Sequence, residues 1–247
     1  WERGEVIPNR TSFEAFYSFL YSQGIRLNEI KSQLWLEEDS KSKVLFHGSR
    51  EGISGGVSLD RSLPKKDFGK GFYCGESLEQ SVSFVAGLPD SSAYIFAFDP
   101  EGLRKEEFEV DQEWMLTIAY FRGQLEAYQN NPLVQKGVKR LLAADYVVAP
   151  IADNRMFELI GRFVGGEITD VQCKHCLSAT SLGKQYVLLS PKSLSKLKQL
   201  EHCYLCASEK KDSLKSRNDL LAIGADKTRI VRAKYKGQGR YIEEILQ

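Results

Sequence analysis

Short stretches rich in β-branched and aromatic residues follow one another from residue 43 to residue 206, with glycines at many of the turns. This composition predicts strands. The predicted strands are KVLFHGS, GGVSL, GKGFYCG, SAYIFAFD, EEFEVD, DYVVAPI, KQYVLLS and LEHCYLC. Apolar periodicity predicts helices over 78–88, 113–128, 132–142, 155–164 and 169–179. Because strands and helices follow in irregular order, we predict an α+β domain with a mixed, largely antiparallel sheet.

The first 42 residues predict a separate helical lobe. Thr11 and Glu14 have the spacing of a capping box, and apolar side chains recur at helical spacing after them. Gly24 is expected to end this helix, and a second one is predicted over 27–38. Two helices joined by a glycine turn also fit a helix-turn-helix DNA reader. Basic residues are few here, so we favour a lobe docked on the main domain.

The last segment, residues 207–247, is predicted as a basic helical tail. From Ser208 onward it holds ten Lys or Arg and six Asp or Glu, and it closes with the amphipathic YIEEIL. One interpretation is a solvated surface helix. The other is a basic arm that steers a phosphate-bearing substrate or RNA.

Charge, hydropathy and cysteine content bear on whether the protein binds nucleic acid, enters a membrane or is secreted. The net charge of +1 gives no global field that would attract nucleic acid or membrane. No apolar run approaches the roughly 20 residues that span a bilayer. No signal-peptide pattern opens the chain, and the five cysteines are odd in number. We therefore expect a cytoplasmic protein without a disulfide framework and without a membrane partner.

Three fragments carry candidate chemistry. The first predicted strand ends in His47, Gly48 and Ser49. The second fragment is DFGKGFYCG, in which Gly69 and Gly71 would let the backbone run close to a ligand near Tyr73. The third is a later strand that begins near Gln185. Each fragment alone is a weak signal.

Together, LFHGS, GKGFY and KQYVLL resemble, in order and spacing, the ADP-ribosyltransferase superfamily in its branch of poly-ADP-ribose polymerases and diphtheria toxin. The sequence around these three fragments looks even more similar to an uncharacterised bacterial family of that superfamily. This similarity extends over residues 43–206. The resemblance implies a split mixed or antiparallel sheet with helices, and NAD as the substrate that donates ADP-ribose.

The resemblance also implies roles for single residues. His47 would bind the adenosine ribose, and the backbone of Gly48 would bind the carboxamide. Ser49 would contact the nicotinamide ribose or the amide. Tyr73 and Phe84 would stack on the two faces of the nicotinamide ring. His47, Tyr73 and Gln185 are the implied catalytic set.

Gln185 departs from the superfamily, which usually has glutamate at this position. An amide can bind the ribose 2′-hydroxyl, but it brings no negative charge to the oxocarbenium-like sugar. Asp153 or Glu158 would supply the missing carboxylate, unless they are a helix N-cap and a first-turn acid. Arg122 would bind the NAD pyrophosphate, or alternatively form a surface ion pair.

The cysteines leave two interpretations open. The pairs Cys173–Cys176 and Cys203–Cys206 have the C-x-x-C spacing of zinc ligands. Helix and strand patterns around them instead favour buried apolar thiols, so we expect no zinc. Cys74 is expected to be a core residue and not a nucleophile.

These observations predict an NAD-dependent ADP-ribosyltransferase that modifies a macromolecule, either protein or RNA. A bacterial toxin or phage-defence effector fits this activity, with an antitoxin or inhibitor protein as a partner. Two alternatives stay open: an inactive module that binds NAD or ADP-ribose, and an NAD glycohydrolase.

Overall fold

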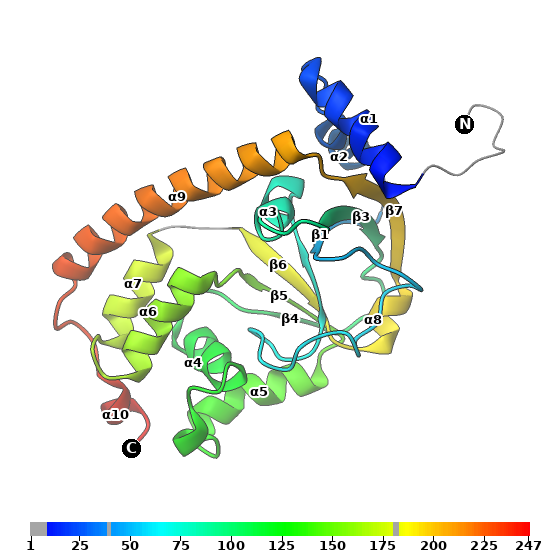
Figure 1. Cartoon of the computed structure of the whole chain (residues 1–247). Helices are drawn as coiled ribbons and strands as arrows, with labels where there is room; N and C mark the ends of the chain where they lie inside the picture. Colours follow the sequence, from blue (N-terminus) through cyan, green and yellow to red (C-terminus); the bar gives the residue numbers. More distant parts are fainter. Residues whose placement is uncertain (1–8, 39–40, 180–182) are drawn as a thin grey trace. The chain divides into compact units, whose positions relative to one another are not determined.

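The computed structural model describes residues 9–38, 41–179 and 183–247, and Figure 1 shows its helices and strands, with labels except for β2 and η1. The described residues divide into two compact units. Unit 1 comprises Trp1–Gly56, Cys74–Pro100 and Lys196–Asp219, and unit 2 comprises Val57–Tyr73, Glu101–Ser195 and Leu220–Gln247. Each unit is made of three separate stretches of the chain.

Unit 1 is built on antiparallel strands. β1 (Lys43–Ser49) pairs with β3 (Ser92–Phe98) along its whole length, and β3 pairs with β7 (Leu197–Tyr204). The boundary between the units falls within strand β2 (Phe72–Gly75), after Tyr73. Gly75, which belongs to unit 1, pairs with Phe46 of β1. The apolar face of this sheet carries a core with α3 (Leu78–Ser83), which includes Phe46, Val82, Val85, Ile95 and Leu205.

The helices α1 (Arg10–Ser22) and α2 (Leu27–Glu37) also belong to unit 1. The ring of Phe13 stacks on that of Tyr204 with 4.5 Å between centroids, so α1 packs against β7. The predicted capping box at Thr11 and Glu14 is wrong. The N-cap is Asn9, whose side chain accepts a hydrogen bond from the Ser12 amide, so the helix begins earlier than that box requires.

Unit 2 contains a smaller group of strands. β4 (Lys105–Glu107) runs parallel to β5 (Tyr146–Pro150), and β5 is antiparallel to β6 (Lys184–Leu188). The predicted strand GGVSL does not form, since residues 55–59 are bends and coil. Parallel and antiparallel pairs together with many helices confirm the α+β class.

Helices surround a second apolar core in unit 2. They are α4 (Gln112–Phe121), η1 (Glu126–Tyr128), α5 (Pro132–Ala143), α6 (Asn154–Val164) and α7 (Asp170–Ser178), and the short helix α8 (Pro191–Ser195) also belongs to unit 2. In α6 the buried residues Met156, Leu159, Ile160 and Phe163 recur at i, i+3, i+4 and i+7. That face packs into the core with Trp114, Ile118 and Val147.

The C-terminal segment is largely exposed, as its composition predicts, since Gly224 is the one buried residue of its long helix. Helix α9 (Ala207–Lys234) places Leu214 against the core of unit 1 and Val231 against that of unit 2. Ile242 and Ile245 of α10 (Ile242–Ile245) are core residues of unit 2. The closing YIEEIL is therefore an anchor of this unit. Within the described ranges, no helix has both the length and the apolar character that crossing a bilayer requires.

Candidate active site

The His-Gly-Ser sequence forms the end of β1 in unit 1. Leu45 and Phe46 are fully buried, and Phe46 faces the core that α3 covers. Gly48 shares this face, because side chains alternate along a strand. A Cβ on Gly48 would lie 2.3 Å from the carbonyl oxygen of Ser81 on α3. The glycine therefore allows α3 to approach the strand closely.

His47 lies on the opposite face of β1 and is half-buried. It is paired in register with Tyr94 of β3, which in turn is paired with His202 of β7. Directly paired residues project from the same face, so the three rings follow one another across the strands. The rings of Tyr94 and His202 stack at 4.5 Å and 8°, and the Tyr94 hydroxyl accepts from the Ile53 amide at 2.8 Å.

Ser49 and Phe84 complete the predicted residues of unit 1. Ser49 is buried at the end of β1, opposite Ser92. Phe84 is the C-cap of α3, and 43% of it is exposed. The guanidinium of Arg217 lies 5.2 Å from the centre of the Phe84 ring. An exposed aromatic ring at this position is available to a ligand.

In unit 2 the DFGKG loop is tied to Tyr73. The Tyr73 hydroxyl donates to the Gly69 carbonyl at 2.8 Å and accepts from the Phe68 amide at 3.1 Å. Burial, followed by the nearby charge of Asp67, raises the pKa of this phenol above its usual value. Tyr73 is therefore a neutral side chain whose hydroxyl holds the loop.

The two glycines of this loop are explained by packing within unit 2. Gly69 has a φ of +72°, which favours glycine. A Cβ on Gly71 would lie 2.7 Å from Cγ1 of Val187 on β6. The loop thus runs directly against the strand that carries Gln185.

Gln185 is a buried polar residue of β6, paired with Ala149 of β5. Its Nε2 donates to Oδ2 of Asp67 at 3.0 Å and to the Pro150 carbonyl at 3.0 Å. Asp67 is itself only 5% exposed. The amide that stands at the place of the superfamily's glutamate is therefore in contact with a buried carboxylate.

Arg122, which is partly buried, completes this polar cluster. Its Nε donates to Oδ1 of Asp67 at 3.0 Å, and its Nη2 donates to the same oxygen. The guanidinium also lies 4.6 Å from the centre of the Phe157 ring. The charge of Arg122, predicted to meet the NAD pyrophosphate, is thus already paired with Asp67 and packed on an aromatic ring.

The two carboxylates that we considered as substitutes for the glutamate belong to α6 and its N-cap in unit 2. Asp153 is the N-cap of α6, where its Oδ1 accepts from the Met156 amide at 2.8 Å. Glu158 is exposed on the same helix. Sequence reasoning missed Asp67, although it opens the DFGKGFY motif. The available signal was an acid directly before a glycine loop that approaches the Gln185 strand.

All five cysteines are free and buried. Cys173 and Cys176 lie in α7 of unit 2, and Cys203 and Cys206 belong to unit 1. Within the part of the chain that the structure describes, no group of three or more His, Cys, Asp or Glu side chains is arranged to hold a metal ion. Burial raises the pKa of the Cys203 thiol to about 12 and also raises that of Cys74. Both thiols are therefore protonated at neutral pH.

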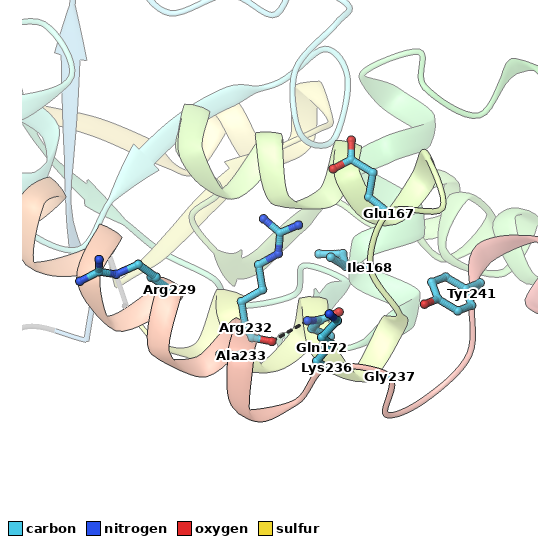
Figure 2. A pocket seen from close by; sticks show the side chains of 9 residues that line it. All are labelled: Glu167, Ile168, Gln172, Arg229, Arg232, Ala233, Lys236, Gly237 and Tyr241. Atoms are coloured by element: carbon cyan, nitrogen blue, oxygen red, sulfur yellow. Dashed lines mark hydrogen bonds between the residues drawn. The ribbon is translucent and has the colours of Figure 1, made fainter.

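A hollow of about 320 Å³ lies in unit 2, between the end of α9 and α7 (Figure 2). Its lining includes the cations Arg229, Arg232 and Lys236 together with Gln172, whose Nε2 donates to the Arg232 carbonyl at 2.6 Å. None of the predicted site residues lines it. Cations in the last turns of a helix also offset the negative end of its dipole, so their presence does not by itself indicate a ligand.

Comparison with known proteins gives one match. No curated protein and no solved structure matches the chain. A family model described as "Protein of unknown function (DUF3990)" matches residues 43–199, which is more than half of the chain and includes every residue predicted to bind NAD. The chain therefore belongs to the DUF3990 family of proteins of unknown function.

Proposed function

We propose that this protein is an NAD-dependent ADP-ribosyltransferase. The observation that supports this most is the polar cluster around Gln185, in which the buried Gln185 amide and the partly buried Arg122 guanidinium both hydrogen-bond the buried Asp67 carboxylate. Buried ionisable groups are costly to desolvate, and they concentrate at functional sites. The cluster stands on the strand where the resemblance to the superfamily implies the catalytic residue.

The proposed reaction breaks the bond between nicotinamide and ribose and attaches the ADP-ribose to an acceptor. The sugar then passes through an oxocarbenium-like state, as in other glycoside cleavages. The residues proposed for NAD are those that the resemblance implies, namely His47, the Gly48 backbone, Ser49, Phe84, Tyr73 and Gln185. Arg122 and Asp153 serve the reaction indirectly, since each already has a structural partner.

The acceptor is proposed to be a protein or an RNA, and the activity to be that of a toxin or defence effector that an antitoxin or inhibitor neutralises. We place it in the cytoplasm, because five free, buried thiols are compatible with a reducing compartment.

A second candidate is a module that binds NAD or ADP-ribose without turnover. The observation in its favour is that Gln185 carries no charge and that Asp67 beside it is paired with Arg122. Neither group then offers an uncompensated negative charge to the sugar cation.

Incubation of the protein with labelled NAD and cell extract separates these functions. Label on a macromolecule is the result expected of the transferase. Free ADP-ribose and nicotinamide without macromolecular label would identify a glycohydrolase. Bound but unchanged NAD would identify the binding module, and the absence of binding would reject NAD as the ligand.

A further inference from the structure

The orientation of the Gln185 amide is fixed by its two partners. Both the Asp67 carboxylate and the Pro150 carbonyl can only accept hydrogen bonds. The NH₂ group must therefore point at them, and a flipped amide would place oxygen against oxygen. Both hydrogens of Nε2 are used in this arrangement.

The remaining polar atom of the side chain is Oε1. No described residue donates a hydrogen bond to it, although the residue is only 6% exposed. Gln185 therefore has an oxygen left as an acceptor. A glutamate at the same position would likewise offer an acceptor oxygen to a ligand hydroxyl.

Asp67 is held in place by the other side of the cluster. Its Oδ1 accepts two hydrogen bonds from the guanidinium of Arg122, and its Oδ2 accepts from Gln185. A guanidinium fork restricts the orientation of a carboxylate as well as its position. Arg122 thus orients Asp67, and Asp67 orients Gln185.

We propose that Asp67 is the positioning residue of the site: it locks the Gln185 amide so that Oε1 accepts from a hydroxyl group of the ligand. This rests on the proposed function, under which that hydroxyl belongs to the ribose of NAD. The Asp67–Gln185 pair thereby supplies a fixed acceptor oxygen at the position of the single glutamate, without its uncompensated negative charge.

The arrangement makes a specific prediction about glutamate at position 185. Its carboxylate would take the place of an amide nitrogen that lies 3.0 Å from Asp67, and two carboxylates this close resist being ionised together. The other titratable groups near this point are the guanidinium of Arg122, the phenol of Tyr73 and the ammonium of Lys66, whose Nζ lies 4.8 Å from the centre of the Tyr73 ring. Arg122 compensates one negative charge and not two, so the carboxyl pair would retain a proton to higher pH.

The first test is therefore a stability measurement, which needs no activity. In Gln185→Glu, the raised folded-state pKa of the carboxyl pair makes stability fall as pH rises from 5 to 8, relative to wild type. In the double variant Asp67→Asn/Gln185→Glu, the amide introduced at position 67 can donate to the new carboxylate, and the additional pH dependence should largely disappear. A Gln185→Glu variant whose melting temperature follows that of wild type over this range would overturn the arrangement.

The second test measures how the positioning role of Asp67 affects the rate of the reaction. In Asp67→Asn the introduced NH₂ group can turn toward Oε1 and let the Gln185 amide flip, so kcat for nicotinamide release should fall by about tenfold or more with a smaller change in KM. The double variant should recover part of that loss. Asp226→Asn, which changes an exposed carboxylate of the same unit, is the matched control and should behave as wild type.

Failure of the proposed function and failure of the positioning role give different results. A folded wild type that binds no NAD would reject the proposed function, while the pH test would still decide whether residues 67 and 185 are coupled. An active wild type with an unimpaired Asp67→Asn variant would reject the positioning role and leave the transferase assignment standing.

Discussion

The backbone of Gly48 lies against the carbonyl oxygen of Ser81, so close that a Cβ on residue 48 would be 2.3 Å from that oxygen and 3.0 Å from Cγ2 of Val85. Ser81 also donates through its hydroxyl to the Phe46 carbonyl at 3.0 Å. The glycine of the His-Gly-Ser sequence therefore has a packing role within unit 1. This role is independent of any ligand.

Gly48→Ala should lower the free energy of unfolding by about 1–3 kcal/mol, because strand β1 or helix α3 must shift to admit the methyl group. Denaturant unfolding measures this loss. Gly87→Ala is the control, since its new Cβ would meet only Leu214 at an ordinary 3.9 Å. Equal stability of the two variants would show that α3 does not approach β1 as closely as this.

Tyr73→Phe and Tyr73→Ala separate the two roles of this side chain. The phenylalanine keeps the ring but leaves the Gly69 carbonyl and the Phe68 amide without this partner, so stability should fall by roughly 1–3 kcal/mol. NAD affinity should change little in this variant. The alanine should also lose roughly 1–3 kcal/mol of binding through the missing stack. Calorimetric titration of both variants with NAD makes the comparison, and equal affinities would remove Tyr73 from the binding site.

Phe84→Ala offers a cleaner test of ligand stacking, because the ring is exposed and contributes little to the core. We expect an unchanged melting temperature and an NAD affinity that is lower by roughly 1–3 kcal/mol. Leu142→Ala removes another exposed apolar side chain, in unit 2, and should alter neither quantity. Unchanged NAD binding in Phe84→Ala would show that the exposed ring does not stack on the ligand.

Much of the fold could be predicted from periodicity. The helix predicted over 155–164 is α6, which begins one residue earlier at Asn154, and its apolar stripe is the buried face. The strand KVLFHGS is β1 with the predicted bounds. Such elements bury one regular face, and their local pattern is sufficient to identify them.

Elements whose role depends on distant contacts could not be predicted in this way. GGVSL has a strand-like composition but forms no strand, since strands are stabilised by pairing and not by local preference alone. The YIEEIL end is recognisable as amphipathic, but the sequence does not indicate that Ile242 and Ile245 pack into the core of unit 2. The role of Asp67 could not be predicted either, because it also depends on a distant contact. Its partner Gln185 is 118 residues away in the sequence, and nothing local indicates that pairing.

A half-buried histidine in unit 1 predicts how stability depends on pH. The His202 ring stacks on that of Tyr94 at 4.5 Å, and its Nε2 is buried without a hydrogen-bond partner among the described residues. Burial, together with the positive charges of Arg10 and Lys31, lowers the pKa of this imidazole. In the unfolded chain the imidazole takes up a proton near its ordinary pKa of about 6.5, whereas the folded protein resists protonation until a lower pH. The unfolded state therefore binds more protons in this window, and wild-type stability declines as pH falls below about 6.5.

His202→Phe should make the protein less sensitive to mild acid. Phenylalanine keeps a ring for Tyr94 to stack on and removes the titrating group, so the decline in stability should become shallower. The measurement is the midpoint of denaturant unfolding at a series of pH values from about 5 to 8. The two proteins are compared as slopes, because the larger ring changes packing by an amount that does not depend on pH. Parallel curves would mean that His202 is protonated as readily in the folded state as in the unfolded one, contrary to its burial beside the aromatic rings of Tyr94 and Tyr204.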